Sequence, residues 1–293
     1  MKQGYFKALF QIFLLTGFST VVNAQKITEL QEVSVKAPHA VKIDGKNFEW
    51  QDANFSVNKR TNLAYIMSND DKNLYLVIKS TDVPNNMKIL AGGITLSVNP
   101  DGKKKEKESI TLTYPIIHRA SRGGQGGGRG QFRTMGMAAG GGGQPNTKQR
   151  DSMMAAMQKT QLAQAKEIKI KGFKNTTDTL VSIYNEFGIK AFANIEKDNS
   201  FFYEIGIPLE ALGISADSAA EFAYNIKVNG LQLPGLDGGF GGGGGGGRGN
   251  FGGGGGGMRI GGGGGGGGMR SSINFQDMMS PTDFWGKYIL VKK

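Results

Sequence analysis

The sequence predicts an all-β fold: an antiparallel β-sandwich with one short surface helix and two long glycine-rich insertions that we expect to be disordered. Three observations lead to this prediction. Apolar residues recur at every second position in several short segments, which is the period of a strand. Turn-forming residues, and not long helices, join these segments. Two low-complexity stretches, 119–150 and 238–270, lack the apolar side chains needed to fold alone.

The first 24 residues are typical of a secretory signal peptide. Lys2 and Lys7 precede an apolar run over residues 8–22, and Ala24 provides a small side chain before the expected cleavage site. The run is too short for a permanent membrane span. We therefore expect an exported protein, periplasmic, extracellular or at the cell surface, that does not span the membrane after cleavage.

The domain organisation follows from these boundaries. Residues 25–40 are expected to form a lead-in, and residues 41–292 a single sandwich domain interrupted by the two glycine-rich insertions. The chain contains no cysteine. Disulfides and a lipid attached to cysteine are thereby excluded, so the fold must be stabilised by its core or by bound metal.

The positive charge is concentrated in a few segments. The formal net charge is +11, from 35 Lys and Arg against 24 Asp and Glu. The signal peptide contains two of the basic residues, 119–150 contains six and 238–270 contains three, and none of these segments contains an acidic residue. The remainder is therefore neutral, and any polyanion binding should come from the insertions.

The first predicted strands lie between residues 73 and 114. The segment KNLYLVIKS alternates Leu74, Leu76 and Ile78 with the opposite set, and we expect one of its faces to be buried. The stretches 94–98 and 110–114 alternate in the same way. A turn at 99–102, which contains Pro and Gly, is expected to join them into a hairpin.

Further strands follow the first insertion. Residues 189–195 and 203–207 predict a second hairpin across the polar turn 196–199, and residues 222–228 predict another strand. The last strand, at 288–290, lies after the polyglycine tract and has to be buried in the same sandwich. The tract is therefore expected to be an internal loop, whose length costs only about 2 kcal/mol in closure entropy.

Two helical stretches are expected. Residues 151–166 have good helix propensity, with Asp151 or Ser152 as the N-cap and a thin apolar stripe, so this helix should lie on the surface. The stripe consists of Met153, Met154, Met157 and Leu162. Residues 208–212 form a short turn that begins with Pro and ends at Gly213.

Several phrases in their order resemble the family 9 carbohydrate-binding modules, which are β-sandwiches related to DOMON domains. The phrases are VKIDGKNFEWQD, SNDDKNLYLVIKSTD, GGITLSVNPDGKKK, YEIGIPLEALGI and DFWGKYILVKK. They span residues 41–292 apart from the insertions. The resemblance implies extracellular glycan binding, often with calcium in the fold, and it is more specific for fold than for function.

The candidate ligand-binding residues are aromatic and acidic. Family members hold sugars between aromatic rings, which makes Trp285, Trp50 and Tyr75 the candidates here, although Trp50 lies where the family's opening tryptophan packs in the core. Asp70 and Asp71 offer carboxylates that suit calcium. The same residues are also good turn formers, which is the favoured interpretation of the two.

No sequence motif supports catalysis, and we expect the protein not to be an enzyme. The Arg-Gly spacing around Arg122, Arg129, Arg248 and Arg259 is typical of polyanion contacts, although export excludes intracellular nucleic acid. The favoured alternative is that the two insertions are spacers in which Arg maintains solubility. Two functions therefore stay open. One is a glycan-binding sandwich, and the other is a surface or envelope scaffold whose cationic loops contact acidic polymers or protein partners.

Overall fold

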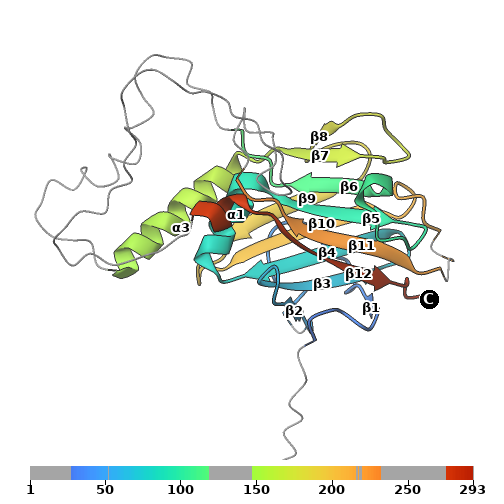
Figure 1. Ribbon diagram of the computed structural model, residues 1–293, viewed down its shortest axis with the longest axis horizontal. Coiled ribbons are helices and arrows are strands. Elements are labelled where there is room, and N and C mark those ends of the chain that lie inside the picture. The colour runs from blue at the N-terminus through green and yellow to red at the C-terminus, as the bar shows by residue number, and fades with distance from the viewer. Residues whose placement is uncertain are drawn as a thin grey trace, which may run out of the picture.

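The predicted β-sandwich is confirmed by a computed structural model of the chain (Figure 1). The structure describes residues 28–51, 53–118, 147–215, 217, 220–231 and 275–292. Two six-stranded sheets, called sheet A and sheet B below, overlie one another in this view. Neighbouring strands are antiparallel except for one short parallel pair, β1 with β3.

Sheet A has the strand order β1-β3-β4-β10-β9, and β2 also pairs with β3. Its strands are β1 (Val35–Lys36), β2 (Ser56–Asn58), β3 (Leu63–Asn69), β4 (Asn73–Ser80), β9 (Lys190–Ile195) and β10 (Phe201–Pro208). The predicted hairpin of 189–195 with 203–207 is confirmed, because β9 and β10 pair from Phe201 opposite Ile195 to Gly206 opposite Lys190.

Sheet B has the strand order β12-β11-β5-β6-β7-β8. Its strands are β5 (Ile94–Asn99), β6 (Ile110–Tyr114), β7 (Glu167–Lys171), β8 (Leu180–Ser182), β11 (Phe222–Val228) and β12 (Thr282–Tyr288). The predicted hairpin of 94–98 with 110–114 is also confirmed, with Ile94 opposite Tyr114 and Val98 opposite Ile110.

The main core lies between the two sheets. It is formed by the alternate residues that the sequence pattern singles out, including Leu76 and Ile205 from sheet A and Leu96 and Ile226 from sheet B. Burying these apolar side chains is the main stabilising contribution to the sandwich. Each strand of sheet B thereby presents its other set of side chains to the outside of the molecule.

The expectation that β4 buries only one face is wrong. Tyr75 and Val77 point away from the main core, yet they are 6% and 0% exposed. They belong to a second apolar cluster on the outer face of sheet A, in which they pack with Trp50 and Phe202. The segment 35–55 covers this face, and part of it is the stretch that the sequence suggested as a lead-in.

The predicted surface helix is α3 (Thr147–Ala163). It begins four residues earlier than expected. It exposes Met153 and Met157, whereas Leu162 is buried in the main core. Among the described helices, none is long and apolar enough to cross a membrane.

Two further helices were not predicted from the sequence. Helix α1 (Val83–Gly92) begins after Asp82, whose side chain accepts the backbone N–H of Asn85. Helix α4 (Phe275–Met279) precedes the last strand. Both lie at one end of the sandwich beside α3 (Figure 1).

The last strand, β12, pairs with β11 over seven residues, from Phe222 opposite Tyr288 to Val228 opposite Thr282. The strands on either side of the polyglycine tract therefore pair in the same sheet, but the last strand is 282–288 and not 288–290 as the sequence pattern predicted. Gly286 lies opposite Tyr224, and a Cβ at this position would meet the Tyr224 ring at 2.2 Å. The glycine thus allows β12 to lie close over the tyrosine ring.

Candidate functional site

The outer face of sheet B is polar in all of its central strands. On β5, Leu96 and Val98 point into the core, so Thr95, Ser97 and Asn99 point outward. The same alternation directs polar side chains outward from β11, β6 and β7, because the inward positions of these strands belong to the core. The sequence pattern that builds the core therefore also directs polar side chains outward from these strands, although Ser97, Asn99 and Asn225 are themselves buried.

The strand register aligns these outward side chains in two rows across the sheet. The first row consists of Trp285, Asn225, Ser97, Thr111 and Lys171. The second row consists of Asp283, Lys227, Thr95, Thr113 and Lys169. We call these ten residues the polar face. Each row crosses five strands, a distance of about 19 Å at the usual strand spacing.

Hydrogen bonds within the polar face fix several of its side chains. Thr95 Oγ1 and Thr113 Oγ1 are 2.7 Å apart, and Asn229 Nδ2 donates to Thr95 Oγ1 at 2.9 Å. Asn225 Nδ2 donates to Asp283 Oδ2 at 2.8 Å and to the backbone oxygen of Phe284 at 3.0 Å. A ligand would therefore meet groups that already have defined positions.

Two polar atoms in the first row have hydrogen-bonding capacity that the described residues do not use. Ser97 and Asn225 are 0% and 1% exposed, and neither Ser97 Oγ nor Asn225 Oδ1 has a hydrogen-bond partner among the described residues. An unpaired buried polar group costs about 1–3 kcal/mol. Such atoms also occur elsewhere among the described residues, for example Ser68 Oγ and Tyr203 Oη, so they do not by themselves mark a binding site.

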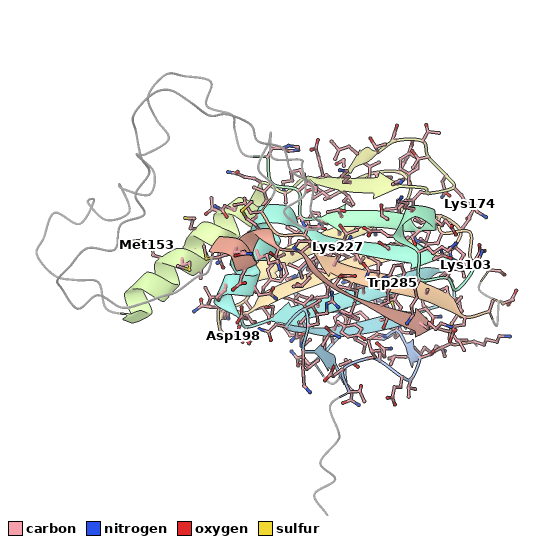
Figure 2. The ribbon with its side chains drawn as sticks, viewed as in Figure 1. Lys103, Met153, Lys174, Asp198, Lys227 and Trp285 are labelled. Carbon is pink, nitrogen blue, oxygen red and sulfur yellow. The ribbon has the colours of Figure 1, made fainter. Side chains whose placement is uncertain are left out.

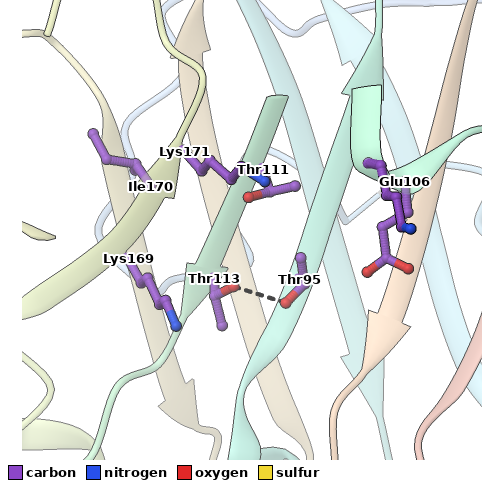
Figure 3. A pocket seen from close by; sticks show the side chains of 8 residues that line it. Thr95, Glu106, Thr111, Thr113, Lys169, Ile170 and Lys171 are labelled. Carbon is purple, nitrogen blue, oxygen red and sulfur yellow. Dashed lines mark hydrogen bonds between the residues drawn. The ribbon is translucent and has the colours of Figure 1, made fainter. Parts of the chain in front are cut away.

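A groove lies along the β5–β6–β7 side of the polar face. The connection between β5 and β6 contains the short helix η2 (Glu106–Glu108), and Glu106 forms an ion pair with Lys227 on β11. The groove between η2 and the strands has a volume of about 380 Å³ and is open to solvent (Figure 3). It is lined by Thr95, Glu106, Lys107, Thr111, Thr113, Lys169, Ile170 and Lys171.

Trp285 forms the opposite end of the first row. It lies on the edge strand β12, is partly exposed and points away from the core, since the adjacent Phe284 is buried (Figure 2). None of the ring pairs formed by described residues includes Trp285. Its partly exposed indole therefore offers a stacking surface, as the sequence suggested for this residue.

Trp50 has the core position that the sequence favoured for it. It is 0% exposed, and its Nε1 donates to Glu204 Oε1 at 2.9 Å, between segment 35–55 and the outer face of sheet A. Tyr75 is 6% exposed and packs against Trp50 with 6.4 Å between ring centroids. Both rings lie on the outer face of sheet A, so the structure does not bring them together with Trp285. Trp50 and Tyr75 are too deeply buried to stack against a sugar at the surface, so the prediction that they bind carbohydrate is wrong.

The acidic pair at 70–71 forms a turn. Asp70 Oδ1 accepts the backbone N–H groups of Lys72 and Asn73, both at 2.7 Å, and its Oδ2 accepts the Tyr75 hydroxyl at 2.7 Å. Burial acts to raise the pKa of Asp70, but these hydrogen bonds hold it below its ordinary value. The part of the chain that the structure describes holds no group of three or more His, Cys, Asp or Glu suited to a metal. The geometry at Asp70 and Asp71 fits turn formation better than calcium binding.

The other candidate residues lie outside the described residues. These are Arg122, Arg129, Arg248 and Arg259 of the two insertions. The scaffold hypothesis that depends on them stays a prediction.

Sequence reasoning missed the lysine end of the polar face. Lys169 and Lys171 belong to β7, a strand that was not predicted. The segment EIKIK contains the signal, because Ile168 and Ile170 alternate with the two lysines and are both buried. The segment is only five residues long and follows directly on the predicted helix, which extended to residue 166.

Comparisons with known proteins give little beyond this geometry. No family model and no curated protein matches the chain. Among solved structures, the chain is similar to a family 9 carbohydrate-binding module from Caldicellulosiruptor kristjanssonii in complex with glucose. The TM-score is 0.32 at 9% identity, and the match covers 68% of this chain and 78% of the other. Membership of that family therefore stays a prediction.

Proposed function

We propose that this protein is an exported, non-catalytic protein that binds glycan chains on the polar face of sheet B. The observation that supports this proposal is the aligned first row, in which the indole of Trp285, the hydroxyl of Thr111 and the ammonium group of Lys171 reach the surface, while Asn225 and Ser97 between them are buried. Glycans present alternating C–H surfaces and hydroxyl groups. An aromatic ring packs against the former, and fixed polar side chains hydrogen-bond the latter.

The shape of the site favours a chain over a single sugar. The first row extends about 19 Å across the sheet, and the groove beside it is open along its length. Sites for small molecules are usually concave and enclose most of the ligand. A shallow surface with its binding groups spread over five strands is better suited to several consecutive sugar units.

The groups in the groove support binding and not hydrolysis. Most glycosidases use a pair of carboxyl groups on either side of the scissile bond. Among the residues that line the groove, Glu106 alone is acidic, and it is held in an ion pair with Lys227. This arrangement supports a role in adhesion or capture of a glycan.

The test is calorimetry with the chain from Gln25 onward and oligosaccharides identified on a glycan array. Trp285→Ala should weaken binding at least tenfold, which corresponds to about 1.4 kcal/mol, because it removes the stacking surface. Phe48→Ala is the matched control: Phe48 is 73% exposed but does not belong to the polar face. The proposal fails if no glycan binds, or if Trp285→Ala binds as tightly as the unaltered chain.

A further inference from the structure

The lysine end of the polar face carries positive charge that the described residues do not neutralise. Lys107, Lys169 and Lys171 line the groove, and Glu106 is the acidic residue of its lining. Glu167 shares the outward face of β7 with Lys169 and contacts His118. Glu106 is itself bound to Lys227. Three ammonium groups are thus left around one groove in a chain whose charge is otherwise balanced outside the signal peptide and the glycine-rich insertions.

Other lysines near this face have carboxylate partners. Lys103 pairs with Asp101 at 3.4 Å, Lys105 pairs with Glu108 at 3.0 Å, and Lys287 pairs with Glu221. By contrast, Lys107, Lys169 and Lys171 form no ion pair with any residue that the structure describes. Other described lysines, such as Lys104, Lys166 and Lys174, also form no ion pair, so what distinguishes these three lysines is that they line one groove.

The spacing of the cations also suits a repeating anion. Lys169 and Lys171 occupy alternate positions on the same face of β7, about 7 Å apart along the strand. Thr113 lies opposite Lys169 and Thr111 lies opposite Lys171 in the ladder. Each ammonium group is thus accompanied by a hydroxyl group that can donate to a carboxylate or accept from a sugar hydroxyl.

We propose that the groove selects acidic oligosaccharides, with Lys169 and Lys171 contacting the carboxylates of successive or alternate uronic acid units. This inference rests on the proposed glycan-binding function and specifies its ligand class. Trp285 stacks against one end of the chain, and the lysines contact the charged groups at the other.

The composition of the site argues against a nucleic acid as the anion. Lysine can bind phosphate, but the planar fork of Arg, which binds phosphate with two parallel hydrogen bonds, is absent from the lining of the groove. Single-stranded nucleic acids also require several stacking rings in succession. The polar face has one such ring, Trp285, and its central positions are hydroxyl and amide groups.

The experiment compares hexagalacturonate with cellohexaose, a neutral chain of the same length, by calorimetry. The unaltered protein should bind hexagalacturonate at least tenfold more tightly, and the difference should shrink as salt is raised. The double variant Lys169→Gln and Lys171→Gln should weaken hexagalacturonate binding five- to twentyfold, since one exposed ion pair accounts for at most about fivefold. Its binding of cellohexaose should change less than twofold.

The matched control is the double variant Lys190→Gln and Lys197→Gln, which removes the same charge from exposed positions on the sheet A side. It should leave hexagalacturonate binding unchanged. An equal loss in both double variants would overturn the proposal, because it would show a response to net charge and not to the groove. Circular dichroism and melting temperatures establish that all variants are folded.

The remaining outcomes separate this inference from the function on which it rests. If cellohexaose binds as tightly as hexagalacturonate and Trp285→Ala weakens both, selection of acidic chains is wrong and glycan binding on the polar face stands. If neither chain binds and the array shows no other glycan ligand, both proposals fail.

Discussion

The two outer faces of the sandwich differ in the polarity of their side chains and in whether another segment of the chain covers them. On sheet A the outward side chains of β4 and β10 are largely apolar, and the chain covers them with its own segment 35–55. On sheet B the outward side chains are polar, and a groove of about 380 Å³ remains open over them. The two tryptophans follow this division, since Trp50 is buried on the first face and Trp285 is partly exposed on the second.

This difference shows how residue type alone can separate structure from function in a symmetrical architecture. A sheet face that is apolar has to be covered, and the covering segment then contributes to stability. On the polar face Ser97 and Asn225 are buried, but Trp285 at one end and Lys169 and Lys171 at the other stay accessible to solvent. Comparing the two faces therefore indicates which substitutions should affect folding and which should affect binding.

The largest effect on stability should come from Trp50→Ala. It removes a fully buried ring and leaves Glu204 without its indole partner, so the free energy of unfolding should fall by about 3–5 kcal/mol. Trp285→Ala should change it by less than about 1 kcal/mol, because the ring is partly exposed. Urea denaturation of both variants gives the comparison. Similar losses in the two would contradict the division between the faces.

The next largest effect is the pH dependence of stability that arises from Glu204 on the covered face of sheet A. Its carboxylate accepts N–H groups from Trp50 and Gly45, both at 2.9 Å, and from Asp44 at 3.3 Å. Burial raises the pKa of Glu204 to about 7, from an ordinary value of 4.5, although these hydrogen bonds act to lower it. Between these pH values the folded chain binds more protons at this site than the unfolded chain.

Stability should therefore decrease as the pH rises from about 4.5 to about 7, by an amount on the order of 3 kcal/mol from this group. Glu204→Gln should remove this part of the slope, because the amide does not ionise. The measurement is urea denaturation of both proteins across this range. An unchanged slope in the variant would mean that Glu204 is not responsible.

The smallest effect is expected from a chelator. Both oxygens of the Asp70 carboxylate already accept hydrogen bonds from Lys72, Asn73 and Tyr75. EDTA should therefore leave the melting temperature unchanged within about 1 °C, with added calcium as the control. A clear fall in melting temperature with EDTA that added calcium reverses would show that calcium stabilises this fold.

Much of the fold could be predicted because its strands have local signals. The alternation in 94–98 and 110–114, with turn residues between them, specifies a hairpin without any knowledge of the rest of the chain. Helix α1 was missed because its Asn85 and Asn86 have low helix propensity. Their side chains donate to backbone oxygens of Thr61 and Ser80, which are tertiary contacts that a local pattern does not reveal.

The candidate site was predictable only in its separate parts. The alternation indicates which residues of β5 and β6 point outward, but the rows depend on the order β12-β11-β5-β6-β7. Trp285 lies beside Asn225 although the chain between their strands includes the whole polyglycine tract. The burial of Glu204 likewise depends on Gly45 and Trp50, more than 150 positions earlier in the sequence.

The position of β12 after the polyglycine tract has a consequence for biosynthesis. Residues 282–288 are synthesised only after this tract, so β11 has an uncovered edge until the tract has been made. An open edge of this kind is a template for pairing with other chains. A product that stops within the polyglycine tract would lack Trp285 and would keep this aggregation-prone edge, so synthesis of β12 affects both aggregation and the proposed ligand binding.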